Sequence, residues 1–278
     1  MSKQLTEYKY SVITTCKGRL HHLQETLPCM TLDEQAEIIV VDYDCPQGTY
    51  DWVKTAYRER VKLVKFNDRP KFNASIARNA GAKVASCEVL IFIDADIIAH
   101  ENSLRSMAAM CNPETYVTIS QGTEAKEKNN KQTTGTVAIH RTNFNKVEGY
   151  DEVFNSWGGE DSDIYNKLYE ICVKNAKIPA DGFSSIDHSN TDRLKFHDEK
   201  NLKKLAKQTQ ILVDILAAAR KAKINLNEKQ KLEIYSLLKE NKNLFNNIKF
   251  KLENPNISIN CRRRNYFIGP MQVRVRTC

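Results

Sequence analysis

The sequence predicts an α/β protein: a mostly parallel sheet flanked by helices, followed by a basic, mainly helical C-terminal extension. Short apolar runs alternate with helical segments over residues 8–94, as in sheets whose parallel strands are joined by crossover helices. The charge also changes sign along the chain. Residues 1–194 carry 23 Lys+Arg and 27 Asp+Glu (net −4), and residues 195–278 carry 19 and 7 (net +12), which sum to the overall +8. We therefore predict a body over residues 1–195 and an extension over residues 196–278.

The first part of the body contains four predicted strands with helices between them. The strands are Tyr8–Thr15, Glu37–Asp42, Val61–Phe66 and Glu88–Asp94. The helices are an amphipathic run around Leu20, Leu23 and Leu27, then Thr49–Arg60 and Asn73–Ala85. Glu37–Asp42 and Glu88–Asp94 are continuous apolar runs, which are typical of strands covered on both faces.

After Pro113 the pattern becomes less regular. Strands are predicted at Tyr116–Gln121 and Thr133–His140, with a polar loop at Glu124–Gln132, and a helix is predicted at Glu160–Asn175. In the extension we expect two helices and then short strands. These elements are Asn201–Ala222, Asn227 to about Phe250, and the strands within Ile257–Cys278.

Composition limits the class of protein. The eight cysteines form no C-x-x-C pair, so we expect free thiols in a reducing compartment rather than a zinc cluster or a redox motif. No run of about 18 uncharged apolar residues exists, and the first residues lack the apolar core of a secretory signal. The expectation is a cytoplasmic protein.

Polar residues follow three of the predicted strands. Thr15 and Arg19 lie after the first, Asp42 after the second and Asp94 at the end of the fourth. Ligands of α/β sheets bind beyond the carboxyl ends of parallel strands, so these side chains predict a nucleotide site. Asp42 is equally explained as a turn-forming residue, because the loop Asp44–Gly48 follows it.

Asp94 and Asp96 are candidates for a divalent metal site. Residues i and i+2 of an extended chain project to the same side, so both carboxylates can face one cation. His188, in a later polar loop, has the imidazole that would complete such a site. The alternatives are a pair of solvated acids at a strand end and a solvent-exposed loop histidine.

Residues 156–163 combine features suited to a sugar. Gly158 and Gly159 permit close approach of the backbone, and Trp157 offers a face on which a sugar ring stacks. Glu160 and Asp161 then open a helix, and such a carboxylate can act as a general base. Acids in a first helical turn also complement the helix dipole, which is the simpler interpretation of their placement.

Three motifs in this order resemble GT-A (Rossmann-like) glycosyltransferases of the family-2-like group. They are Ala77–Gly81, Phe92–Asp96 and Trp157–Asp161, and the nearest likeness is to the galactosyltransferase and bacterial chondroitin-polymerase type over roughly residues 8–195. The resemblance implies that Asp94 and Asp96 bind Mn²⁺ (or Mg²⁺) and the nucleotide diphosphate, and that His188, or else His197, also binds the metal.

The resemblance implies further roles. Asp161, with Glu160 beside it, is the expected catalytic base, and Asp42 is expected to bind the nucleoside. The remaining residues expected to bind the nucleotide-sugar are Thr15, Arg19, Arg78, Asn79, Ala95, Trp157, Gly158 and Gly159. Judged from the residues alone, Arg78 could reach a phosphate, but a surface arginine on its helix is the default interpretation. The chain departs from the usual D-D-G-S after the second strand, which is Asp42–Cys45 here.

The expected reaction is transfer of a hexose or N-acetylhexosamine from a UDP-sugar to a hydroxyl of a glycan, a polysaccharide or a lipid-linked sugar. An aspartate after W-G-G-E points to inversion of the anomeric centre. The alternatives are a non-catalytic carbohydrate-binding or scaffold protein of the same fold, and a sugar nucleotidyltransferase. The last should carry a glycine-rich loop after the first strand, where this chain has only Gly18.

The basic extension allows two interpretations. Leu202, Leu205, Leu212 and Leu216 form one helical stripe, which we expect to pack on the body. The alternative is peripheral docking to the inner face of an anionic membrane, near a lipid-linked acceptor. Nucleic acid is not expected as a partner, because Arg262–Arg264 lacks interleaved aromatic residues beyond Tyr266 and Phe267.

Overall fold

The computed structural model describes residues 8–100, 102–120 and 133–240, together with the backbone of four later strands, 248–251, 258–262, 265–269 and 275–276. The predicted polar loop Glu124–Gln132 therefore lies outside the described residues.

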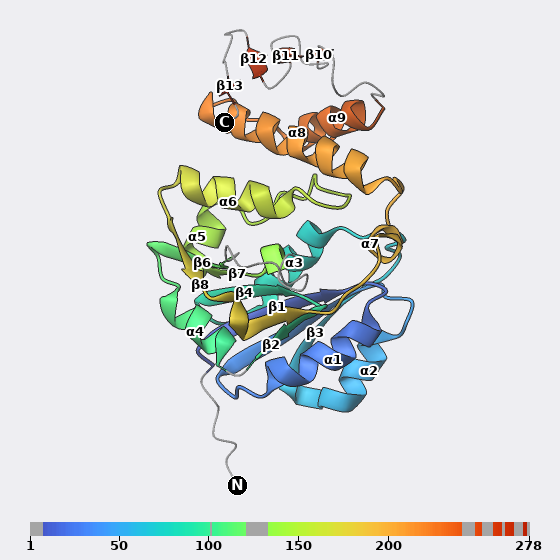
Figure 1. The fold of residues 1–278 in the computed structure, drawn as a ribbon, viewed down its shortest axis with the longest axis vertical. Coiled ribbons are helices and arrows are strands. Elements are labelled where there is room, and N and C mark those ends of the chain that lie inside the picture. The colour runs from blue at the N-terminus through green and yellow to red at the C-terminus, as the bar shows by residue number, and fades with distance from the viewer. Residues whose placement is uncertain are drawn as a thin grey trace.

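A seven-stranded sheet forms the centre of the molecule, in the order β3-β2-β1-β4-β7-β6-β8 (Figure 1). Its strands are β1 (Tyr10–Cys16), β2 (Ala36–Tyr43), β3 (Val61–Phe66), β4 (Val89–Asp94), β6 (Thr115–Ile119), β7 (Val137–His140) and β8 (Lys174–Ile178). Only β7 is antiparallel to its neighbours in this sheet, so the predicted mostly parallel sheet is confirmed.

Helices cover both faces of the sheet, which explains why its strands are apolar on both sides. The helices α1 (Leu20–Thr31), α2 (Thr49–Tyr57) and α4 (Ser103–Met110) pack on one face. The helices α3 (Ala74–Val84), α5 (Arg141–Lys146) and α6 (Glu160–Glu170) pack on the other. Alternate residues of each strand divide between the two cores: Val12 faces the first and Ile13 the second, both fully buried.

A two-stranded ribbon lies beside the main sheet and determines where the later loop runs. It pairs β5 (Ile97–Ala99) with β9 (Phe183–Ser185), and the amide of Ile186 then donates to the carbonyl of Asp96 at 2.8 Å. The ribbon thereby brings residues 186–188 next to the end of β4. The chain continues into α7 (Asn190–Leu194), which begins with a capping box between Ser189 and Asp192.

Three sequence predictions were wrong in detail. The helix predicted over Glu160–Asn175 ends at Glu170, because Cys172 takes a left-handed conformation (φ 64°), and β8 follows. The strand predicted over Thr133–His140 begins only at Val137, after a 3-10 turn at Thr133–Gly135. The last predicted helix ends at Glu240 rather than near Phe250, which lies in a strand.

The extension contributes two helices that pack on α6 and on the segment before it. These helices are α8 (Leu202–Lys221) and α9 (Glu228–Glu240), and Figure 1 shows them stacked beyond α6. Leu205, Leu212 and Leu216 are buried, so the leucine stripe packs on protein as expected. Arg220 of α8 also pairs with the buried Asp163 of α6 at 2.9 Å.

Four short strands, β10 (Ile248–Lys251), β11 (Ser258–Arg262), β12 (Asn265–Gly269) and β13 (Val275–Arg276), form a separate antiparallel sheet in the extension. In the described part of the extension, helices therefore extend to Glu240 and strands follow from Ile248. Among the residues that the structure describes, no helix has the length and apolar character needed to cross a membrane.

Candidate active site

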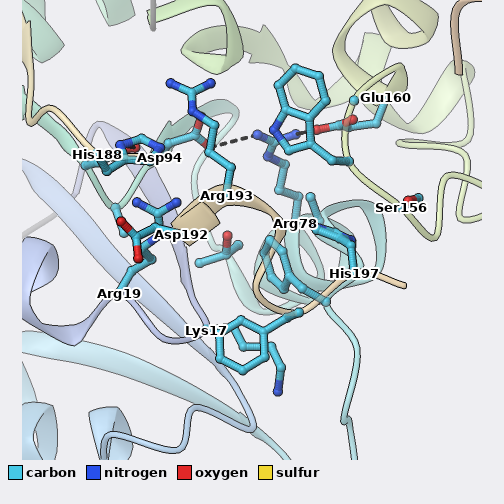
Figure 2. A pocket seen from close by; sticks show the side chains of 18 residues that line it. Lys17, Arg19, Arg78, Asp94, Ser156, Glu160, His188, Asp192, Arg193 and His197 are labelled. Carbon is cyan, nitrogen blue, oxygen red and sulfur yellow. Dashed lines mark hydrogen bonds and ion pairs between the residues drawn. The ribbon is translucent and has the colours of Figure 1, made fainter. Parts of the chain in front are cut away.

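A cavity of about 170 Å³ opens at the carboxyl ends of β1 and β4. Its walls come from segments that are distant in sequence: the loop after β1, the start of α3, the end of β4, the start of α6, and the segment around α7 (Figure 2). Among the predicted site residues, those that line it are Thr15, Arg19, Arg78, Asp94, Ala95, Asp96, Trp157, Gly158, Glu160 and His188. The topology thus brings together the three motifs identified in the sequence.

Arg78 connects the acidic residues of the two main motifs. Its guanidinium donates to Asp94 Oδ1 at 2.8 Å, to Asp161 Oδ1 at 2.9 Å and, with weaker geometry, to Glu160 Oε1 at 3.2 Å. Burial alone would lower the pKa of this arginine, but the carboxylates of Asp161 and Asp94 hold it well above the usual value. The side chain is 5% exposed, so Arg78 is a buried counter-ion and not a surface arginine.

The two acids that open α6 are both shifted toward their protonated forms. Burial, and next the charge of Asp161, raises the pKa of Glu160 to about 7. Burial also raises the pKa of Asp161, although the neighbouring Arg78 opposes the shift. Glu160 Oε2 is buried without a hydrogen-bond partner, and Glu160 lines the cavity. Asp161 is not among the residues that line the cavity, and Gly135 of the 3-10 turn lies close to its carboxylate.

A second cluster lies at Asp96. Its carboxylate is 3.2 Å from Nδ1 of His188, and His22 of α1 completes a group whose potential ligand atoms all lie within 4.8 Å of one another. Burial lowers the pKa of His22 to about 4 and that of His188 in the same direction, so both imidazoles are neutral at pH 7. One carboxylate and two neutral imidazoles are donors that suit a divalent transition metal. This set fits a metal ion.

The glycines before α6 are required by the backbone. Gly158 and Gly159 have φ of 84° and 96°, a region that favours glycine. A Cβ on Gly159 would lie 2.7 Å from a ring carbon of Phe154 and 2.9 Å from Cβ of Thr209. The α6 terminus therefore lies directly against α8 of the extension. Trp157, just before the glycines, lines the cavity, as Glu160 does.

Comparisons with known proteins agree with this geometry. The model "Glycosyltransferase like family 2" matches residues 12–133, and the model "N-terminal domain of galactosyltransferase" matches residues 115–191, so together they span all three motifs at the cavity. A search of curated protein sequences found no match. The chain is a glycosyltransferase with the GT-A fold.

Solved structures show the same fold at low sequence identity. S. aureus TarS 1–349 in complex with UDP-GlcNAc has a TM-score of 0.59 and 15% identity, with 83% of this chain and 71% of that chain covered. The mannosyltransferase PcManGT from Pyrobaculum calidifontis, in complex with GDP-Man and Mn²⁺, has a TM-score of 0.55 and 14% identity, with coverage of 82% and 68%.

Three predicted binding residues of the glycosyltransferase do not line the cavity: Gly159, which packs on Phe154 and Thr209, Asp42 and Asn79. Asp42 is buried, and its two oxygens accept from the amides of Cys45 and Tyr50 at 2.7 and 2.9 Å, as in the alternative of a turn-forming residue. Asn79 exchanges hydrogen bonds with the backbone of Tyr150. Nucleoside or sugar binding by these three residues stays a prediction.

The group of potential metal ligands in the structure differs in one residue from the predicted group of Asp94, Asp96 and His188. His22 belongs to the group with Asp96 and His188, whereas the Asp94 carboxylate is engaged by Arg78. His197, the alternative ligand, lines the cavity with its pKa lowered to about 4 by burial, but among the described residues it is not part of this group.

Sequence reasoning also missed several residues that line the cavity. They are Lys17, Phe72, Ala74, Ser156, Asp192, Arg193 and Phe196. The Lys17 ammonium lies over the Phe196 ring at 4.9 Å and donates to the carbonyls of Tyr43 and Asp44, so it joins three separate segments. The Asp192-Arg193 pair four residues after His188 was the one sequence signal for this group.

Proposed function

We propose that this glycosyltransferase transfers a hexose or N-acetylhexosamine from a UDP-sugar to an acceptor hydroxyl with inversion, with a divalent metal and with Asp161 as base. The observation that supports the proposal is the shared guanidinium. Arg78 contacts both Asp94, at the proposed diphosphate side, and Asp161, at the proposed acceptor side. A single buried side chain therefore links the two proposed halves of the site.

The diphosphate side is electrostatically suited to an anionic leaving group. Arg19 lines the cavity at the start of α1, and Arg193 lines it at α7 (Figure 2). A Mn²⁺ or Mg²⁺ ion held by Asp96 and His188, with Asp94 nearby, would neutralise charge on the departing nucleoside diphosphate. The arginines add fixed positive charge within the same cavity, which lowers the barrier to departure of that group.

The acceptor side has the properties of a general base. A carboxylate whose pKa is raised by burial removes a proton from an alcohol more readily than an ordinary aspartate does. Asp161 would accept the proton of the acceptor hydroxyl as its oxygen attacks the anomeric carbon. Glu160, with its unpartnered Oε2 at the cavity wall, would hydrogen-bond a sugar hydroxyl. Trp157 would stack on the sugar ring.

The proposed nucleotide follows from resemblance, and the proposed acceptor from resemblance and from the charge of the extension. TarS in the solved complex binds UDP-GlcNAc, and PcManGT binds GDP-Man. We propose a UDP-sugar on the resemblance to the galactosyltransferase type. The acceptor would be a glycan, a growing polysaccharide or a lipid-linked sugar, and the positive extension would support peripheral contact with an anionic membrane.

The test is a screen of UDP- and GDP-sugars for slow, Mn²⁺-dependent hydrolysis, followed by variants assayed with the donor that is found. Asp161→Asn should bind that donor with an unchanged Kd and lose hydrolysis and transfer, because the base is removed and the diphosphate side is kept. Asp163→Asn is a poor control, because Asp163 is buried and paired with Arg220. The control is Glu152→Gln, because Glu152 is an exposed acid outside the cavity. Full activity of Asp161→Asn would refute the assignment of the base.

The configuration of the product tests inversion separately. Proton NMR of the glycoside formed from an α-linked UDP-sugar should show a β-linked product. An α-linked product would refute inversion and leave the donor site unaffected.

A further inference from the structure

His22 is a buried polar residue that the proposed reaction does not use. It lies in the first turn of α1 and is 4% exposed, whereas its neighbour His21 is exposed. The ring of His22 lies 5.6 Å from the ring of His188, centroid to centroid. A ligand atom of His22 is within 4.8 Å of one from Asp96 and one from His188. Three elements, α1, the end of β4 and the loop after β9, thus converge on one point.

We propose that His22 is a ligand of the divalent metal, in a set of two imidazoles and one carboxylate with His188 and Asp96. The inference rests on the metal-dependent function proposed above and specifies which side chains of this chain hold the ion. His188 is held beside this carboxylate, because its Nδ1 lies 3.2 Å from both the carbonyl of Ile186 and Oδ2 of Asp96.

Asp94 is the residue that the D-x-D pattern would otherwise place in the set. Its Oδ1 accepts from Arg78 at 2.8 Å, and Gly135 lies against Oδ2, where an added Cβ would be 2.7 Å away. The Asp94 carboxylate therefore lies between the arginine and the 3-10 turn, while Asp96 faces the two histidines. His22 takes the position in the set that the pattern assigns to Asp94.

The ligand types determine which ion binds best. Imidazole nitrogen favours later first-row transition metals, and Mg²⁺ prefers oxygen ligands and water. A set with two imidazoles should therefore bind Mn²⁺ or Co²⁺ at least about tenfold more tightly than Mg²⁺. Arg19 approaches Nδ1 of His22 at 3.3 Å, so this arginine, which also lines the cavity, lies close to the proposed ion.

The test measures Mn²⁺ binding by electron paramagnetic resonance, with and without UDP, in the wild type, His22→Ala and His21→Ala. We expect a loss of at least about tenfold in Mn²⁺ affinity for His22→Ala, as expected when a metal site loses a ligand, and a change below about twofold for His21→Ala. Equal Mn²⁺ affinity in all three proteins would overturn the inference and leave the metal dependence of the proposed function intact. Absence of Mn²⁺ binding to the wild type, with UDP present, would overturn both.

A measurement on the wild type alone does not depend on the folding of a variant. Pulsed electron paramagnetic resonance detects nitrogen nuclei bonded to Mn²⁺, and the proposal predicts two imidazole nitrogens. A single coordinated nitrogen would overturn it.

Discussion

Replacing Arg78 by methionine should destabilise this protein strongly, and more at alkaline than at acidic pH. The variant leaves three carboxylates without their shared counter-ion. Asp94 is 36% exposed and remains hydrated, but Glu160 and Asp161 are only 10% and 25% exposed. Breaking a buried ion pair by removing one partner costs about 3–5 kcal/mol. For a domain of this size that loss corresponds to a fall of about 6–20 °C in Tm.

The pH dependence of this effect follows from Glu160. Its pKa in the folded protein is raised from 4.5 to about 7, so its contribution to stability is greatest below pH 4.5 and is lost as the pH rises through 7. Without Arg78 the pKa of Glu160 rises further, because the one neighbouring group that lowers it by its charge is gone. The difference in Tm between wild type and Arg78→Met should therefore be larger at pH 8 than at pH 5.

Differential scanning fluorimetry at pH 5 and pH 8 measures both effects. Arg105→Met is the matched control, because Arg105 also pairs with one carboxylate, Asp33, but its side chain is 51% exposed. A surface pair contributes at most about 1 kcal/mol, so the control should shift Tm by no more than about 4 °C. If Arg78→Met lowered Tm by no more than about 4 °C, or by the same amount at both pH values, the role of Arg78 as the buried counter-ion of Glu160 and Asp161 would be refuted.

Two further predictions concern stability. Burial lowers the pKa of His197 from 6.5 to about 4, so the folded state resists its protonation and the free energy of unfolding falls between pH 6.5 and pH 4. In urea unfolding, His197→Gln should lessen that fall by up to about 3 kcal/mol. An unchanged dependence of unfolding free energy on pH would contradict this. Gly159→Ala should lower the free energy of unfolding by about 2–4 kcal/mol, because its Cβ would crowd Phe154 and Thr209 and its φ is unfavourable for alanine. Gly48→Ala should lower it by only about 1 kcal/mol, because φ is 77° but no atom lies within 4 Å of the added Cβ. Equal losses for the two glycines would remove the packing part of the argument.

The sequence predicted the parallel part of the fold well because its strands are buried on both faces. Val61–Phe66 was predicted with the bounds that the structure has, and Glu88–Asp94 differs from β4 by one residue. β8 was missed because Lys174–Ile178 is an edge strand with mostly exposed or half-exposed side chains, so it carries no apolar run. The helix predicted from Glu160 also extended over the first two residues of β8, Lys174 and Asn175.

The sequence predicted which motifs meet at one cavity, but not the partners that tertiary structure supplies to their side chains. Asp94, Asp96, Glu160 and His188 line one cavity, as motif order had indicated. His22 had no comparable signal, because only the packing of α1 against the end of β4 brings it to His188. Asp42 lies at the predicted strand end, but its carboxylate accepts hydrogen bonds from the backbone amides of Cys45 and Tyr50. The position of those amides is set by the turn after the strand, which the strand pattern does not predict.

The most direct test of the account is the position of the metal in crystals soaked with MnCl₂ and UDP. Diffraction measured at the manganese absorption edge distinguishes manganese from the lighter atoms of the protein and the nucleotide. The account predicts one strong anomalous peak within bonding distance of Asp96 and His188, with the diphosphate beside it in the same cavity. A manganese ion bound elsewhere, or a diphosphate bound away from the Asp94–Asp96 end of β4, would contradict the central claim.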